Sequence, residues 1–288
     1  MADVTSSEPS GAVSSTPLVG GIANATIGVA PTGMTAAPLP ARIRASMLLR
    51  CFAIQGSWNY EILGGNGLGF CVEPALRQLP GGVDGDAYKQ ALARQCGYFN
   101  AHPYLASLAV GSLARAELDR TPPDKILRFR TALCGPLGSL GDRLVWAAWL
   151  PACSLVALLL FGFGWGPLGV AVGFLILYNI GHVALRAWGL GAGWLYGMRL
   201  ASALSARWLQ LGPQYIGRGA ALVAGIALPF ASHRAIGGGP ILDPVPLAVV
   251  ALTPCLALLL VRLHGKVEGW QLLFGLLAIL VLYSTVVL

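Results

Sequence analysis

One short segment of an otherwise apolar chain concentrates polar and aromatic side chains: residues 55–61, Gln-Gly-Ser-Trp-Asn-Tyr-Glu. Amide groups both donate and accept hydrogen bonds, a carboxylate accepts strongly, and an indole ring offers a flat apolar face. A sugar presents hydroxyl groups and an apolar ring face, so Gln55, Trp58, Asn59 and Glu61 are candidates to bind one. Alternatively, the aromatic rings anchor a membrane interface and the polar side chains cap helix ends.

A second cluster is Phe99-Asn100-Ala101-His102-Pro103. Pro103 suits the first turn of a helix, and apolar residues follow it at helical spacing. Asn100 and His102 are expected either to cap that helix or, because a helix start within a membrane offers free N–H groups, to line a ligand site beside it. His102 has no partner at metal-ligand spacing, so no metal site is expected.

The third cluster is Gly135-Pro136-Leu137-Gly138-Ser139-Leu140-Gly141-Asp142-Arg143. Three glycines and a proline at this spacing disfavour a regular helix, so we expect a tight turn or a broken helix. Asp142 then lies at a membrane boundary, where carboxylates are candidates for a functional role. The alternative is a structural ion pair with Arg143 or Arg130.

The composition places these clusters in a membrane protein. Of the 288 residues, 56% are apolar and only 11% are charged, and the mean hydropathy is +0.68; soluble domains carry roughly 25% charged residues. The net charge is +7, and 12 of the 19 Lys and Arg residues lie within residues 42–143, interleaved with eight of the 12 Asp and Glu residues. No basic block with interleaved aromatic residues is present, so nucleic acid is not an expected partner. The sequence shows no catalytic pair or nucleophile motif, which disfavours an enzyme.

The apolar stretches predict an all-α fold with about five transmembrane helices. A span needs about 20 apolar residues, and the candidates lie near 145–163, 167–185, 217–235, 245–263 and 270–288. Asn179 and His182 interrupt the second span, where they face a polar cavity or pair with another subunit. Residues 188–211 are too interrupted to predict a span. The distribution of basic residues predicts a cytoplasmic N-terminus.

Three regions follow from this pattern. Residues 1–41 are rich in small and polar residues and are expected to be a disordered leader. Residues 42–143 contain the clusters and are expected to form re-entrant, interfacial or broken helices, with Met47 to Ile54 too short to cross and either interfacial or buried in a core. The Gly-rich segment 64–69 is expected to be a flexible turn, and the six cysteines to be reduced thiols. Residues 144–288 form the transmembrane region.

Taken together, the motifs resemble the Enzyme IID component of the mannose/fructose/sorbose-family phosphoenolpyruvate-dependent sugar phosphotransferase system. The resemblance rests on residues 55–61, 99–103 and 135–142, supported by Leu-Gly-Phe at 68–70 and Tyr-Asn-Ile-Gly-His at 178–182. It covers roughly residues 42–288. Three departures are a Gly-rich insertion of about two residues within 62–67, Arg130 at a basic position where the family commonly has Lys, and Arg143, where the family usually has a small residue or proline.

The resemblance implies a permease subunit of the bacterial inner membrane that pairs with a membrane subunit, IIC. Cytoplasmic IIA and IIB proteins carry the phosphoryl group, so a IID chain carries no catalytic residue, metal or cofactor of its own. The expected partners are IIC, IIB, IIA, a hexose-type sugar and membrane lipid. The alternative is a diverged structural or regulatory scaffold that binds IIC without transport.

The resemblance also divides the candidate residues into two groups. Those expected to line the sugar pathway or to contact IIC are Gln55, Trp58, Asn59, Glu61, Asn100 and His102. Those expected to shape the core or the interface are Gly135, Pro136, Gly141, Asp142, Asn179 and His182.

Overall fold

A computed structural model describes residues 38–238, 244, 246–252 and 271. The N-terminal part of this chain folds into a compact head of short helices. They are α1 (Ala41–Cys51), α2 (Gly65–Leu76), η1 (Gly82–Asp84), α3 (Asp86–Gln95) and α4 (Ala106–Leu118). Within the described ranges the only β-type pairing is two isolated bridges, Asn59 with Leu63 and Leu63 with Phe99.

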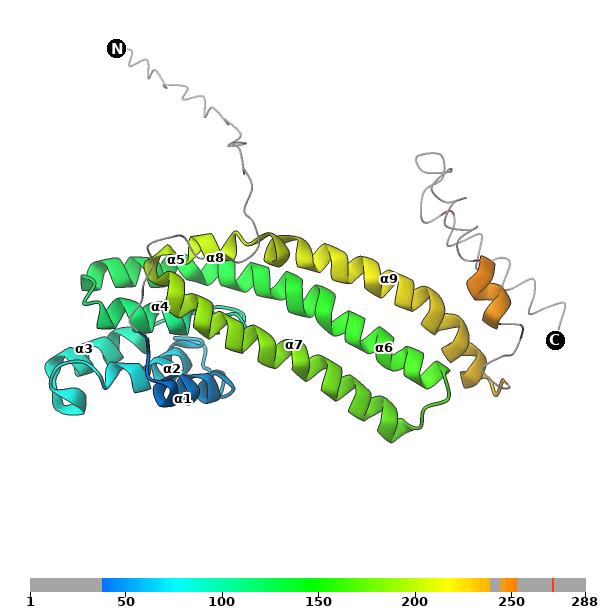
Figure 1. Cartoon of the computed structure of the whole chain (residues 1–288), viewed down its shortest axis with the longest axis horizontal. Helices are drawn as coiled ribbons and strands as arrows, with labels where there is room; N and C mark the ends of the chain where they lie inside the picture. The colour runs from blue at the N-terminus through cyan, green and yellow to red at the C-terminus, as the bar shows by residue number, and fades with distance from the viewer. Residues whose placement is uncertain (1–37, 239–243, 245, 253–270, 272–288) are drawn as a thin grey trace, which may run out of the picture.

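Three long rods extend from the head and lie side by side (Figure 1). The first joins α5 (Pro123–Gly141), the π-helical η2 (Asp142–Trp149) and α6 (Leu150–Gly162). The second is α7 (Pro167–Tyr196) with η3 (Gly197–Arg199), and the third is α8 (Ala201–Leu204) with α9 (Arg207–Ala235). Each rod is long and apolar enough to cross a membrane. We call the part of the rods beyond residue 141 the arm.

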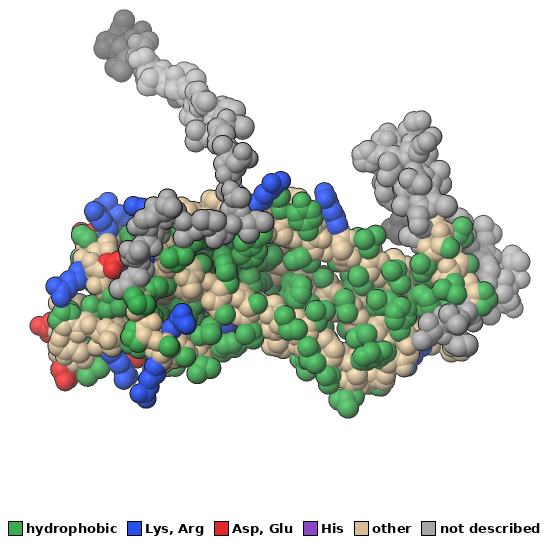
Figure 2. Space-filling view, viewed as in Figure 1, with side chains coloured by type: hydrophobic (Ala, Val, Ile, Leu, Met, Phe, Trp, Pro, Cys, Tyr) green, Lys and Arg blue, Asp and Glu red, His purple; other side chains and the backbone are tan. Residues whose placement is uncertain are grey.

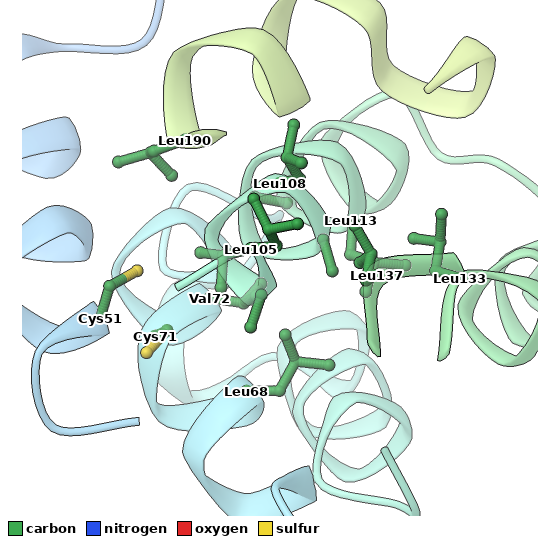
Figure 3. Close-up of a cluster of buried hydrophobic side chains, with 14 of the residues drawn as sticks. Cys51, Leu68, Cys71, Val72, Leu105, Leu108, Leu113, Leu133, Leu137 and Leu190 are labelled. Atoms are coloured by element: carbon green, nitrogen blue, oxygen red, sulfur yellow. The ribbon is translucent and has the colours of Figure 1, made fainter. Parts of the chain in front are cut away.

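The head closes around α4, which packs against α2, α5 and α7. Leu68 and Val72 of α2 meet Leu105, Leu108 and Leu113 of the α4 segment in a buried cluster (Figure 3). Removing such side chains from water is the main force that assembles this part of the chain.

Glycines bring α4 and α7 into direct backbone contact. A Cβ on Gly193 would lie 2.1 Å from the carbonyl oxygen of Leu108, and a Cβ on Gly111 would lie 2.4 Å from that of Leu190. Small residues permit this close approach, as they do between membrane helices. The contact joins the arm rigidly to the head.

Charged side chains gather on the head, whereas the arm is largely apolar on the face seen in Figure 2. Glu73 of α2 accepts hydrogen bonds from Arg50 of α1 at 2.7 Å, Arg77 at 2.5 Å and Tyr88 of α3 at 3.0 Å. Burial alone would raise the pKa of Glu73, but these three donors together lower it below its ordinary value. The carboxylate thus ties three helices together.

The predicted spans agree with the rods where they can be compared. The predicted spans 145–163, 167–185 and 217–235 each coincide with part of one rod. Most of the last two predicted spans cannot be compared, because 253–270 and 272–288 lie outside the described residues. Residues 188–211 form no span of their own, as predicted, because the short η3 and α8 interrupt them before α9 begins at Arg207. Their first part extends α7 to Tyr196. Its glycines there pack against α4 rather than ending the helix.

Two local predictions were wrong. Residues 135–141 are not a break: α5 continues through Pro136, because Leu133, Leu137 and Leu140 are buried on one face of the helix. Residues 64–69 are not a flexible turn but the start of α2. A Cβ on Gly67 would lie 1.7 Å from the carbonyl oxygen of Ile54, so this glycine is required by a tight contact.

One face of the apolar run at 47–54 is buried in the head, as its core alternative predicted, whereas Leu49 and Phe52 are 71% and 43% exposed. Met47, Cys51 and Ile54 are each at most 4% exposed.

Candidate functional site

A cavity of about 260 Å³ opens on the head where three segments of the chain converge. We call it the head cavity. The loop after α1, the segment before α4, and the end of α5 with the start of η2 all contribute to its wall. It is lined by Ile54, Gln55, Trp58, Gly64, Phe99, Asn100, Ala101, His102, Pro103, Ala106, Gly138 and Asp142.

The head cavity brings together residues from all three polar clusters of the sequence. Of the residues expected in a sugar pathway, Gln55, Trp58, Asn100 and His102 line it. Asp142, expected to shape the core or an interface, lines it too. Residues more than 80 positions apart in the chain therefore surround one space.

Asn59 and Glu61 do not line the cavity. The side-chain oxygen of Asn59 accepts hydrogen bonds from the backbone N–H groups of Glu61 and Ile62, both at 3.0 Å. This is a local turn of the kind that Asn commonly forms. The capping alternative was wrong for both clusters, since neither α2 nor α4 has a side-chain cap at its N-terminus.

Backbone hydrogen bonds hold two walls of the cavity together. The N–H of Gly64 donates to the carbonyl of Phe99 at 2.9 Å, and the N–H of Phe99 donates to the carbonyl of Ile62 at 3.2 Å. Leu63, between them, has a positive φ of 51°, a conformation rare for a branched residue. The tight pairing with Phe99 stabilises it.

His102 is the most deeply buried polar group in the cavity wall, at 3% exposure. Its Nδ1 accepts a hydrogen bond from the N–H of Tyr104 at 3.2 Å, so the neutral ring carries its proton on Nε2. Nε2 has no hydrogen-bond partner. Burial lowers the pKa of His102 to about 4, with Asp142 opposing and Arg186 adding to the shift. The ring is therefore a neutral N–H donor at physiological pH.

Arg130 supports the wall from α5. Its guanidinium donates to the backbone carbonyls of Gln95, at 3.1 Å, and Gly97, and lies 5.7 Å from the ring centroid of Phe99. The side chain is only 4% exposed, and no carboxylate among the described residues forms an ion pair with it. Its hydrogen bonds fix the segment that leads into Phe99 and Asn100.

An aromatic cluster connects the cavity wall to α7. The hydroxyl groups of Tyr104 and Tyr178 are 2.6 Å apart, and the ring of His182 lies 4.3 Å from that of Tyr104. Arg186 donates to the carbonyls of Cys51 and Pro103 and lies over the ring of Tyr104. These contacts attach the loops of the cavity to a membrane-length helix.

Asn179 and His182 bond to each other rather than to the cavity. Their side chains are 3.1 Å apart, and the amide of Asn179 also donates to the carbonyl of Leu175 at 2.7 Å. They reach the cavity only indirectly, through Tyr104. Gly135 and Pro136 likewise lie on α5 outside the lining, whereas Gly141 packs against His102.

Sequence reasoning missed Tyr104, Trp146 and the supporting role of Arg130. Trp146 lies 5.2 Å from the ring of His102, a contact that its position in the sequence does not indicate. The sequence suggested Arg130 only as an ion-pair partner of Asp142, because no spacing rule places an arginine of one helix under a loop about 33 residues earlier. No group of three metal-ligating side chains occurs in the part of the chain described here.

A profile of the family described as "PTS system mannose/fructose/sorbose family IID component" matches residues 39–287. The chain is 29% identical over 172 residues to the mannose-specific EIID component of Escherichia coli K12, covering 57% of this chain and 59% of that protein. It is 33% identical over 175 residues to the sorbose-specific EIID component of Klebsiella pneumoniae, covering 57% and 61%. The match thus spans about three fifths of each relative.

The fold is also similar to that of solved membrane proteins. A chain in the cryo-EM structure of the mannose transporter ManYZ with microcin E492 superposes with a TM-score of 0.52 at 23% identity, covering 86% of this chain and 97% of that one. A second structure, titled only as a membrane protein, gives a TM-score of 0.56 at 22% identity, covering 86% and 98%. These likenesses show an all-α membrane fold.

Proposed function

Since the chain belongs to the IID components of the mannose/fructose/sorbose phosphotransferase family, we propose that it is the sugar-permease subunit of a bacterial inner-membrane transporter. It pairs with a IIC membrane subunit, and a cytoplasmic IIB protein, charged by IIA, phosphorylates the sugar on arrival. The N-terminus is cytoplasmic. The chain itself binds and positions sugar and performs no chemical step.

The observation that carries this proposal is the convergence of the three polar clusters on the head cavity. Gln55 and Asn100 supply amides that donate and accept, Asp142 supplies a carboxylate acceptor, and His102 supplies an unpaired N–H donor. Trp58 offers an indole face for the apolar side of a sugar ring. A hexose needs this mixture of groups.

The cavity is suited to binding between two subunits. Trp58 is 48% exposed and Tyr60 is 89% exposed, and their rings meet edge to face at 4.9 Å. Exposed aromatic residues of this kind are typical of binding surfaces. IIC covers this aromatic rim and completes the sugar site, and Asn59 and Glu61 belong to the contact with IIC.

The test is sugar uptake in cells that lack the native chain but express its IIC, IIB and IIA partners. Gln55→Ala and Asn100→Ala should each lower phosphoenolpyruvate-dependent uptake at least tenfold, as expected when a buried hydrogen bond to a ligand is lost. Gln78→Ala is the matched control, because Gln78 is an exposed amide outside the cavity. Mannose, fructose and sorbose are the sugars to compare.

Co-purification with IIC distinguishes transport from a scaffold role. The Gln55 and Asn100 variants should still pull down IIC, whereas Glu61→Ala should weaken the complex. If the cavity variants take up sugar normally while the complex remains intact, the chain acts as a scaffold and the proposed sugar site is refuted.

A further inference from the structure

A second cavity, of about 520 Å³, lies in the arm and has an almost entirely apolar lining. We call it the arm cavity. Its walls come from η2, α7 and α9, and α7 and α9 each pack mainly on the first rod and meet each other at Trp188 and Trp208. It is lined by Leu144, Trp149, Gly181, Ala184, Leu185, Trp188, Trp208, Gly212 and Ile216.

Tryptophans mark the end of the arm cavity nearest the head. The rings of Trp188 and Trp208 meet edge to face at 4.7 Å. From Trp208 the lining continues along one face of α9 through Gly212 to Ile216, a distance of about 12 Å at 1.5 Å per residue. The cavity is therefore an elongated slot along a membrane-length helix.

The elongated shape and apolar lining of the slot indicate which kind of ligand it can bind. An α-helix with its side chains is about 10 Å wide, and the walls of the slot are formed by apolar side chains and glycines. A single extended hydrocarbon chain is much thinner and needs only apolar walls. The slot therefore fits an acyl chain.

Positive charge lies at the same end of the slot. Arg207 immediately precedes Trp208, and Arg199 lies in the same short connection between α7 and α9. Both are exposed, and the ion pairs formed within the described residues do not include them. Residues 144–242 contain no Asp or Glu at all, so nothing nearby in the sequence balances these arginines. Figure 2 shows basic side chains projecting along the first part of α9.

We propose that the arm cavity is a binding site for an anionic phospholipid. One acyl chain lies in the slot between α7 and α9, and the phosphate is bound at the head end by Arg207, with Arg199 beside it. Basic residues at the mouth of a gap between membrane helices are suited to such headgroups. The ligand would hold α7 and α9 at a fixed separation along the slot, beyond the contact between Trp188 and Trp208. The site is separate from the head cavity and does not depend on sugar transport.

The three tryptophans of the lining make the proposal measurable. The full-length chain is purified in detergent and titrated with phosphatidylglycerol or phosphatidylcholine carrying bromine on the acyl chain, which quenches nearby indole fluorescence. Brominated phosphatidylglycerol should quench at lower concentration than brominated phosphatidylcholine. Trp208→Phe should remove most of this difference, whereas Trp165→Phe, at the distant turn between α6 and α7, should preserve it.

Two variants separate the headgroup contact from the slot. Arg207→Gln should reduce the preference for phosphatidylglycerol about fivefold, the effect expected of one basic residue at a membrane surface. Arg128→Gln, an exposed arginine of α5, is the matched control and should change nothing. Ala184→Leu, which narrows the slot at an exposed position, should reduce quenching by both lipids.

Equal quenching by the two lipids, or a phosphatidylglycerol preference that Arg207→Gln leaves unchanged, would overturn the proposal. So would loss of the preference when IIC is co-purified, because the slot would then hold a partner side chain. Circular dichroism of each variant checks that the helices have formed. Failure here leaves the sugar-uptake test unaffected, since that test depends on other residues.

Discussion

The imidazole of His102 lies directly against the backbone of Gly141. A Cβ on Gly141 would come within 2.2 Å of the Cβ of His102 and 2.4 Å of its Cγ. At Gly138, one helical turn earlier, a Cβ would meet nothing within 4 Å. The glycines of this motif therefore have different roles, although the sequence presents them as one group.

Gly141→Ala should destabilise the protein by about 1–3 kcal/mol, the usual cost of forcing extra volume into a packed site. Gly138→Ala should stabilise it by up to about 1 kcal/mol, because alanine favours a helix over glycine and has room here. Thermal unfolding of both variants in the same detergent measures the difference. Equal midpoints would contradict the packing described for His102.

His102 should make the protein less stable in mild acid. Burial lowers its pKa from 6.5 to about 4, so between these values the unfolded chain binds a proton that the folded chain does not. Stability is therefore complete above the unfolded pKa and decreases as the pH falls towards 4, by at most about 3 kcal/mol. His102→Gln should lose less stability than the native chain between about pH 7 and about pH 5. Parallel pH profiles of the melting temperature would show that His102 is not buried as described.

Glu73→Gln should lower the free energy of unfolding by about 2 kcal/mol. It replaces a part-buried carboxylate with a neutral amide and so weakens the hydrogen bonds from Arg50, Arg77 and Tyr88. The pKa of Glu73 is lowered, so its contribution is present above the ordinary pKa of a glutamate and is lost as the pH falls through the folded value. Glu61→Gln, at an exposed glutamate that forms none of the ion pairs within the described part of the head, is the control for stability. An equal effect of the two changes would argue against the cluster.

Arg130→Met should weaken sugar binding more than it lowers the maximal rate of uptake. The substitution leaves the carbonyls of Gln95 and Gly97 without their donor. The segment of the cavity wall that contains Asn100 then becomes less rigid. Loss of two buried hydrogen bonds from a charged group costs about 3 kcal/mol. Arg128→Met, on the exposed side of the same helix, is the matched control. The half-saturating sugar concentration and the maximal rate are to be measured separately, and an unchanged half-saturating concentration would count against this role.

Composition and apolar length were sufficient to predict the all-α membrane fold and the placement of three spans. They failed where glycine is used for contact. Gly67 and Gly193 touch carbonyl oxygens of other segments, and only the tertiary structure distinguishes such a glycine from one in a turn. Pro136 misled for a similar reason, because burial of its helical neighbours outweighs its local effect.

The candidate site was predictable in part. Gln55, Trp58, Asn100 and His102 carry polar or aromatic groups in apolar surroundings, and this contrast is visible in the sequence. Asn59 has the same contrast but uses its side chain to close a turn. Residue type alone does not distinguish these roles, and the direction of each side chain depends on the pairing of Leu63 with Phe99.

The π-helical stretch η2 lies between α5 and α6 without a break in the rod. Its i→i+5 hydrogen bonding makes each turn wider than an α-turn, so every residue after it is rotated about the axis relative to an uninterrupted α-helix. Upstream of this phase shift, Gly138 faces the head cavity; downstream, Gly162 touches the backbone of α9. One rod thus serves two differently oriented neighbours, and deleting a single residue from 142–149 would misalign one of them while leaving the rod helical.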